Sequence, residues 1–240
     1  IGRAGQRTIV ADIARYGDGY FVVLPMTESG GMDADLLITA QDLERIRRMD
    51  GIVAAAGTTS QRMRTKIRAN EYRLDVVGAP AEYERLANLE YAAGGFFSAA
   101  EERARQRVLV VEDRFAEEAF GSAGAALGQR VTFGSRVFRI VGVYKTEPSL
   151  LSGLGGTVYG AYAPIGALQP GSGSPRFGYV EVLASTGEPA ELSRIVGEVR
   201  KLLAQRHNTT ENRYLTQTGA EAQQQVSQVF SMLQIIIGSI

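Results

Sequence analysis

The stretch that decides the fold is RVLVVEDRFAEEAFGSAGAALGQRVTFGSRVFRIVGVYK, residues 107–145. Its first seven residues are a compact apolar run, which predicts a buried strand. Residues 114–128 predict a short helix that ends at Gly121 and continues as a loop of small residues. Residues 129–145 predict a hairpin, because two runs of strand-forming residues flank a glycine–serine turn. This part of the chain therefore mixes helix and sheet.

A similar order of elements is predicted on both sides of this stretch. Before it, the pattern indicates a strand, a helix and two further strands: residues 20–26, a helix that begins after Thr39, and residues 52–65 and 70–78. After it come four further elements: strands 157–165 and 179–185, helix 188–207 and strand 212–218. We interpret strand–helix–strand, early and again late, as a weak internal repeat that an insertion divides.

Helix boundaries have clear local signals. Thr39 and Asp42 have the spacing of a capping box, and so do Ser98 and Glu101. The strongest periodic signal in the chain is the apolar stripe of the helix predicted at 188–207, a spacing typical of a helix packed on a core. The residues of this stripe are Leu192, Ile195, Val196, Val199, Leu202 and Leu203.

Composition excludes several classes of function. The 240 residues suffice for one large domain or two small ones. The 26 basic and 26 acidic residues cancel, so no overall positive field attracts nucleic acid. The chain has no cysteine, which rules out disulfides, thiolate zinc sites, iron–sulfur clusters and cysteine nucleophiles.

The sequence offers no clear catalytic residue, metal site or cofactor site. The single histidine, His207, lies at a predicted helix end, where we expect it to interact with the last carbonyls. Two pairs of neighbouring carboxylates, Glu112-Asp113 and Glu117-Glu118, are predicted to lie at the surface. The glycines of GLGGTVYG precede a strand, in the wrong order for a dinucleotide site. A binding or mechanical domain is the better prediction, and its partner-binding residues stay unknown.

Three segments in a fixed order carry a family resemblance. The segments are GGFFSAAEERARQRVLVVEDRFAEEAFG, LGQRVTFGSRVFRIVGVYK and VYGAYAPI. Together they resemble the extracytoplasmic domain of MacB-type ABC transporter permeases, which are related to FtsX-like permeases. The positions that match the family are Gly95, Phe96 and Phe97; Val108 to Glu112; Ala119, Phe120 and Gly121; Gly128 to Val131; Phe138 to Val143; and Pro164.

The resemblance implies an α+β fold made of two subdomains. A Porter-like subdomain of strand–helix–strand units is split in sequence, and a Sabre-like subdomain is inserted in it. The expected division is residues 1–78 with an N-terminal stalk helix at 2–15, the insertion 79–164, the second Porter-like half 165–218 and a C-terminal stalk helix 219–240. That last helix becomes apolar all round near residue 235, so we expect it to enter the membrane there.

The resemblance also implies a role without catalysis. Such domains lie on the periplasmic side of the inner membrane and couple cytoplasmic ATP hydrolysis to periplasmic work. The implied partners are an ABC ATPase, fused or separate, a second permease copy in a homodimer and a MacA-like periplasmic adaptor, with membrane attachment through the flanking helices. Two alternatives stay open: an FtsX-like regulator of a cell-wall hydrolase, and a lipoprotein-releasing permease.

Overall fold

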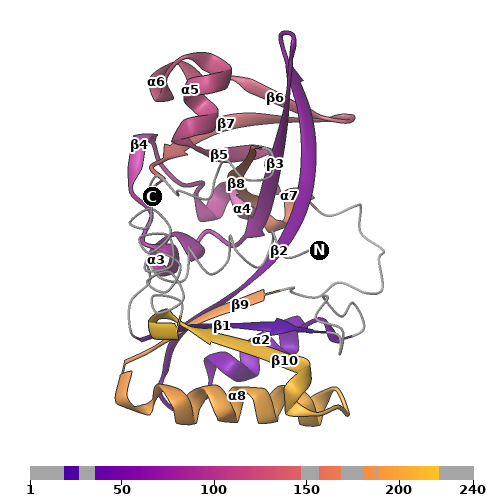
Figure 1. Ribbon diagram of the computed structural model, residues 1–240, viewed down its shortest axis with the longest axis vertical. Helices are drawn as coiled ribbons and strands as arrows, with labels where there is room; N and C mark the ends of the chain where they lie inside the picture. Colours follow the sequence, from indigo (N-terminus) through magenta and orange to yellow (C-terminus); the bar gives the residue numbers. More distant parts are fainter. Residues whose placement is uncertain (1–18, 27–35, 147–156, 169–180, 188, 222–240) are drawn as a thin grey trace, which may run out of the picture. The chain divides into compact units, whose positions relative to one another are not determined.

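The computed structural model describes residues 19–26, 36–146, 157–168, 181–187 and 189–221. These residues form two compact units (Figure 1). Unit 1 consists of the described residues within 1–57 and 177–240, and unit 2 of those within 58–176. Unit 2 is therefore an insertion in the chain of unit 1. The subdomain boundaries predicted at residues 78 and 164 stay a prediction.

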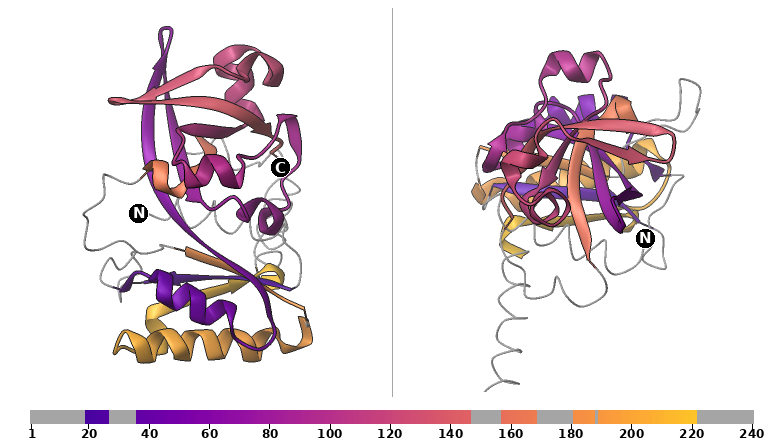
Figure 2. Two further views of the ribbon diagram at one scale, coloured as in Figure 1. Left: turned by 180° about the vertical axis from the view of Figure 1, so that it is seen from behind. Right: turned by 90° about the horizontal axis from the view of Figure 1, so that it is seen from above.

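Unit 1 is a sheet with two helices on one of its faces (Figure 2). The strands are ordered β10–β1–β9–β2, and β1 is antiparallel to both of its neighbours. The elements are β1 (Tyr20–Pro25), α2 (Ala40–Arg47), the start of β2 (Ile52–Ile67), β9 (Glu181–Thr186), η2 (Pro189–Glu191), α8 (Leu192–Arg206), η3 (Glu211–Arg213) and β10 (Tyr214–Thr218). The core joins apolar residues of both helices to one face of the sheet: Phe21, Val23, Leu43, Ile46, Ile195, Val199 and Leu203 are among its most buried members.

Unit 2 is a mixed sheet in which β3 and β8, and likewise β5 and β7, run parallel. The order is β2–β3–β8–β5–β7, and β4 and β6 both pair with β7. Its strands are the rest of β2, β3 (Asn70–Ala79), β4 (Tyr91–Gly94), β5 (Val108–Glu112), β6 (Arg130–Phe133), β7 (Arg136–Tyr144) and β8 (Val158–Pro164). Its helices are α3 (Tyr83–Ala87), α4 (Ala99–Arg103), α5 (Asp113–Phe120), α6 (Ala123–Ala126) and α7 (Ile165–Leu168).

The local signals of the sequence are mostly confirmed. Both capping boxes form, at the start of α2 and of α4. Helix α5 ends where Gly121 adopts a left-handed φ of 91°, a backbone conformation that glycine adopts without strain. The predicted hairpin is β6 and β7.

Four details of the prediction are wrong. The small residues after Gly121 form the helix α6 instead of a loop, because the Ser122 side chain accepts a hydrogen bond from the backbone N–H of Ala125 at 3.1 Å. The α-helix predicted from 188 begins at Leu192, after the 3₁₀ turn η2, and the last strand begins at Tyr214, after η3. Residues 79–95, where the sequence pattern predicts no element, contain α3 and β4.

In unit 1, the start of strand β1 and the end of strand β10 lie side by side at one corner of the sheet. The pairing of β1 with β10 places Phe21, near the start of β1, opposite Thr218, the last residue of β10. A further capping box follows at once: the Thr218 hydroxyl accepts from the Glu221 N–H at 3.2 Å, and the Glu221 carboxylate accepts from the Thr218 N–H at 2.8 Å. Residues 219–221 are helical, as predicted. The rest of the predicted stalk helices, 2–15 and 222–240, lies outside the described residues.

Candidate partner-binding surface

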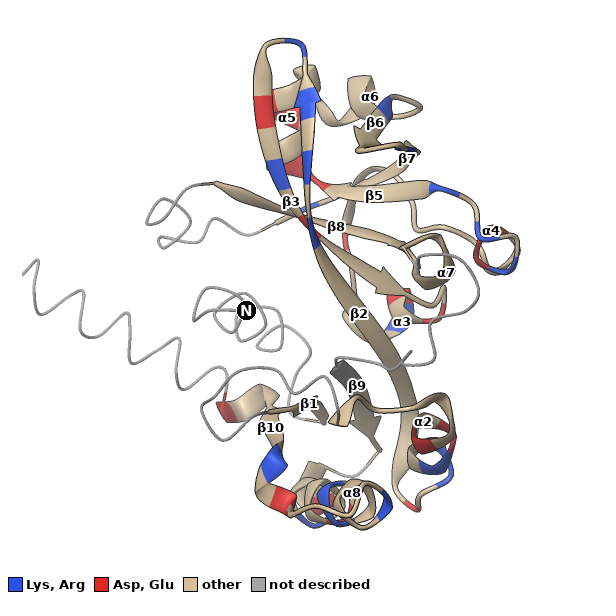
Figure 3. Cartoon of the chain, turned by 90° about the vertical axis from the view of Figure 1, so that its right-hand side faces the viewer, with Lys and Arg blue, Asp and Glu red and all other residues tan. Residues whose placement is uncertain are grey.

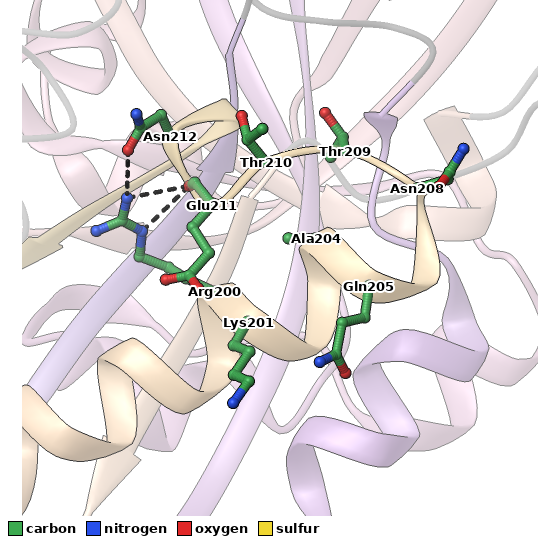
Figure 4. Close-up of a pocket in the computed structure, with 9 residues that line it drawn as sticks. All are labelled: Arg200, Lys201, Ala204, Gln205, Asn208, Thr209, Thr210, Glu211 and Asn212. Atoms are coloured by element: carbon green, nitrogen blue, oxygen red, sulfur yellow. Dashed lines mark hydrogen bonds between the residues drawn. The ribbon is translucent and has the colours of Figure 1, made fainter.

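An open polar pocket of about 710 Å³ lies beside the C-terminal half of α8 in unit 1 (Figure 4). Helix α8 supplies one side of the pocket, and the segment that leads through η3 supplies the other. The lining residues are Arg200, Lys201, Ala204, Gln205, Asn208, Thr209, Thr210, Glu211 and Asn212. Hydroxyl, amide and charged groups dominate this lining, so the pocket suits hydrogen bonding to a polar segment.

Arg200 holds the two sides of the pocket together. Its Nε and Nη2 donate to the carbonyl oxygen of Glu211 at 3.2 and 3.0 Å, and Nη2 also donates to Asn212 Oδ1 at 3.4 Å (Figure 4). A guanidinium used in this way fixes backbone and is not free for a ligand. Lys201, one position further along the helix, has no hydrogen-bond or ion-pair partner among the described residues. The pocket therefore offers a partner two charges, the ammonium of Lys201 and the carboxylate of Glu211.

A buried ionic cluster fixes the end of α8 against α2. We call Thr39, Asp42, Arg206 and His207 the Asp42 cluster. The Asp42 side chain, only 1% exposed, accepts from the backbone N–H of Thr39 at 2.8 Å and from Arg206 Nε. His207 Nε2 lies 2.9 Å from Asp42 Oδ2. The same carboxylate thus caps one helix and holds the end of another.

The predicted position of His207 at a helix end is correct, but the predicted partner of its side chain is wrong. His207 is the C-cap residue of α8, as its position in the sequence indicates. Its imidazole, however, contacts the carboxylate of Asp42 on another helix rather than the last carbonyls of its own helix. The two residues are 165 positions apart, and no local pattern reports such a contact.

The environment of Asp42 lowers its pKa to about 2. Burial alone would raise this pKa, but the hydrogen bonds from Arg206, Thr39 and His207 outweigh burial. In the unfolded chain the same carboxyl titrates near its usual value of about 3.9, so it binds a proton more readily there. The difference corresponds to about 2 to 3 kcal/mol of stability, which is present above about pH 4 and lost as the pH falls towards 2.

We expect Asp42→Asn to remove this acid dependence. At pH 7 the free energy of unfolding of the variant should be about 2 to 3 kcal/mol lower than that of the wild type. This difference, the gap in stability, should narrow as the pH falls below about 4. Urea unfolding across this pH range measures the gap. Asp50→Asn, at an exposed position shortly after α2, is the matched control. A gap that stays constant down to pH 2 would contradict the assignment.

The predicted surface position of Glu112 is wrong. Glu112 is only 5% exposed. One of its carboxylate oxygens accepts a hydrogen bond from the Gly160 N–H and the other from Arg114 Nη2, each at 2.8 Å. Burial raises the pKa of Glu112, and these two donors oppose the rise. Its neighbour Asp113 instead accepts from the Thr146 hydroxyl at 2.6 Å. The two carboxylates therefore have separate structural partners.

Glu117 and Glu118 lie at the surface, as predicted. The Glu118 carboxylate accepts from the Tyr159 hydroxyl at 2.5 Å, so it also has a structural partner. Within the part of the chain that the structure describes, no three His, Asp or Glu side chains lie close enough to hold a metal ion.

A model of the family described as "MacB-like periplasmic core domain" matches residues 1–202. Three relatives illustrate the similarity. Macrolide export ATP-binding/permease protein MacB of Wolinella succinogenes is 23% identical over 154 residues, which are 64% of this chain and 24% of the relative. The uncharacterised ABC transporter permease YknZ of Bacillus subtilis is 23% identical over 247 residues, 100% of this chain and 60% of the relative. The probable syringafactin export ATP-binding/permease protein SyfD of Pseudomonas syringae pv. tomato is 22% identical over 212 residues, 87% of this chain and 31% of the relative.

The chain thus spans from 24% to 60% of the length of these three relatives. Among solved structures, the extracellular domain of YknZ from Gram-positive bacteria gives a TM-score of 0.65 at 18% identity, covering 83% of this chain and all of that domain. The periplasmic region of MacB from Actinobacillus actinomycetemcomitans gives 0.68 at 16% identity, covering 92% of this chain and 98% of that region. These likenesses confirm the predicted α+β fold.

Proposed function

The chain belongs to the family of MacB-like periplasmic core domains, and from this premise we propose that it transmits ATP-driven motion of a transporter to the periplasmic side. Domains of this family are parts of inner-membrane ABC permeases. Among the described residues no helix is long and apolar enough to cross a membrane. We propose that segments outside the described residues attach the protein to the membrane.

The corner of unit 1 where β1 begins and β10 ends is the observation that carries this proposal. Phe21 pairs with Thr218 there, and antiparallel partners lie about 5 Å apart. A helix that arrives before β1 and a helix that leaves after β10 would join unit 1 at this one point. The Thr218–Glu221 capping box sets the start of the second helix. Motion of the two membrane helices would reach unit 1 directly, with no flexible loop between β10 and the helix.

The interior of unit 1 supports a mechanical role. β1 is hydrogen-bonded on both edges, to β10 and to β9. The Asp42 cluster fixes α8 to α2, and both helices share one apolar core with β1. A body packed in this way moves as a whole, which is the requirement for transmitting a displacement.

We propose export as the work that this motion performs. The partners are an ABC ATPase on the same or a separate chain, a second copy of the permease and a periplasmic adaptor. Relatives that are named as ATP-binding/permease proteins and exporters support the ATPase and the direction of transport. Nothing in these comparisons favours a regulator of a cell-wall hydrolase or a lipoprotein-releasing permease.

Isolation of the whole permease from its own membrane tests this proposal. After chemical cross-linking in cells, we expect mass spectrometry to identify an ABC ATPase domain or subunit together with an adaptor protein. ATPase activity of the purified assembly should rise when the exported substrate is added. A peptidoglycan hydrolase recovered in place of an adaptor, with no substrate-stimulated ATPase activity, would contradict export and favour the regulator.

A further inference from the structure

The hairpin formed by β2 and β3 carries more basic than acidic residues near its turn (Figure 3). Side chains alternate between the two faces of the hairpin. Met63, Thr65, Tyr72 and Leu74 are buried on the inner face. The outer face and the turn bring together five basic residues and two acidic ones: Arg62, Arg64, Lys66, Arg68 and Arg73, with Glu71 and Asp75. We call these seven residues the hairpin basic face.

The strand register arranges most of these residues as opposed pairs. Arg62 lies opposite Asp75 and Lys66 lies opposite Glu71, so the outer positions are matched in charge. Between them, Arg64 lies directly opposite Arg73. Like charges in opposed positions destabilise an antiparallel pair. The opposed pairs on the outer face are therefore matched in charge except the central one, in which both residues are arginine.

Glu71 and Asp75 flank Arg73 on β3, but neither carboxylate forms an ion pair with Arg64 or Arg73. Arg64, Lys66, Arg68 and Arg73 have no hydrogen-bond or ion-pair partner among the described residues. A second opposed arginine pair, Arg130 and Arg139, differs in this respect. Glu101 Oε1 lies 3.7 Å from Arg139 Nη2 and balances one of its charges.

We propose that Arg64 and Arg73 hold a carboxylate side chain of an acidic protein partner. The hairpin contains a template for this contact: Arg62 Nε and Nη2 donate to the two oxygens of Asp75 at 2.7 and 2.8 Å. Guanidinium groups favour carboxylates because the two planar forks match. A partner carboxylate between Arg64 and Arg73 would place a negative charge at the one opposed pair that has two positive charges.

A pocket beside Arg64 gives the partner room to continue past the contact. It has a volume of about 380 Å³, and Arg64 is one of its lining residues. Its other lining residues are Gln61, Arg62, Met63, Phe133, Gly134 and Arg136. Arg136 is already engaged, since its Nη1 donates to the Leu168 carbonyl at 3.0 Å. Arg64 is therefore the unpaired charge at this pocket.

A protein partner fits this face better than a lipid surface. Segments that insert into lipid present large apolar or aromatic side chains beside their charges. At the hairpin turn, Arg68, Ala69 and Asn70 are exposed, and the one large apolar residue, Ile67, packs against the core of unit 2. The face thus offers charge complementarity without an apolar anchor.

Arg73→Glu separates this binding role from a structural one. The substitution creates a matched pair with Arg64, so we expect the midpoint of urea unfolding to be no lower than that of the wild type. The probe is a labelled peptide in which glutamate alternates with threonine, titrated against the 240-residue chain and followed by fluorescence anisotropy. Its affinity should fall at least about tenfold in the variant, the equivalent of one lost charge-assisted contact.

Arg130→Glu is the matched control, because it makes the same change of charge at the other opposed arginine pair. It should leave the peptide affinity within about twofold of the wild type. Equal losses in the two variants would overturn the proposal, since binding would then follow net charge alone. Unchanged affinity in Arg73→Glu would overturn it as well. So would vesicles of anionic phosphatidylglycerol that bind through this face when the peptide does not.

Discussion

Gly142→Ala should destabilise unit 2 by about 4 kcal/mol, at the upper end of what single substitutions cost. A Cβ atom at this position would lie 2.0 Å from the carbonyl oxygen of Gly95 and 2.9 Å from its carbonyl carbon. Both atoms belong to the backbone, so no side-chain rotation relieves the overlap. Gly142 pairs with Gly94 on one side and Val110 on the other, so a shift of β7 would strain both ladders.

Urea unfolding of the variant measures this cost, and Gly124→Ala is the control. Gly124 lies in α6, and a Cβ atom there would have nothing within 4 Å. Because alanine favours helix over glycine, the control should be neutral or more stable by about 0.5 to 1 kcal/mol. A Gly142→Ala protein that unfolds at the wild-type midpoint would show that β4 and β7 do not approach as closely as described.

Signals within a few residues of one another predicted most of the element boundaries. Thr39 with Asp42 and Ser98 with Glu101 form the predicted capping boxes, because a cap depends only on a side chain and the next turn of backbone. Ser122 also caps a helix through its side chain, although the sequence pattern predicts a loop there. Small residues such as those of α6 carry no apolar stripe, so periodicity misses a helix this short.

Contacts between distant parts of the chain were not predictable from one sequence. The carboxylate of Asp42 finds Arg206 and His207 more than 160 positions away, and its cap role alone gave no reason to expect them. Glu112 can be buried because its carboxylate accepts a hydrogen bond from the Gly160 N–H on the neighbouring strand β8. The pair of carboxylates at 112 and 113 in the sequence does not reveal this contact. The hairpin basic face could be recognised only once the register of β2 and β3 was known, because the register shows that Arg64 lies opposite Arg73.

A flexible glycine–serine insertion directly after Glu221 should abolish most export by the whole transporter. Thr218 and Glu221 join the end of β10 to the helix without an intervening loop. A glycine–serine segment behaves as a random coil and does not transmit displacement. We expect export to fall about tenfold or more, within the range typical of coupling between two sites, while ATP hydrolysis persists.

The same insertion between Gly121 and Ser122, in the turn that joins α5 to α6, is the control for folding and expression. Both residues are exposed, and a Cβ atom at Gly121 would have nothing within 4 Å. Loop insertions at such a turn are tolerated, because each doubling of loop length costs only about 0.6 kcal/mol. Export should therefore remain within about twofold of the wild type, the change that a few tenths of a kcal/mol produces.

The most direct test of transmission through this corner is the amount of substrate exported per ATP hydrolysed, measured with the purified transporter in lipid vesicles. For the insertion after Glu221, our proposal predicts a ratio about tenfold or more below that of the wild type, with ATP hydrolysis close to normal. For the insertion between Gly121 and Ser122, it predicts an unchanged ratio. An unchanged ratio after the Glu221 insertion would contradict the proposal that this domain transmits motion through the paired ends of β1 and β10.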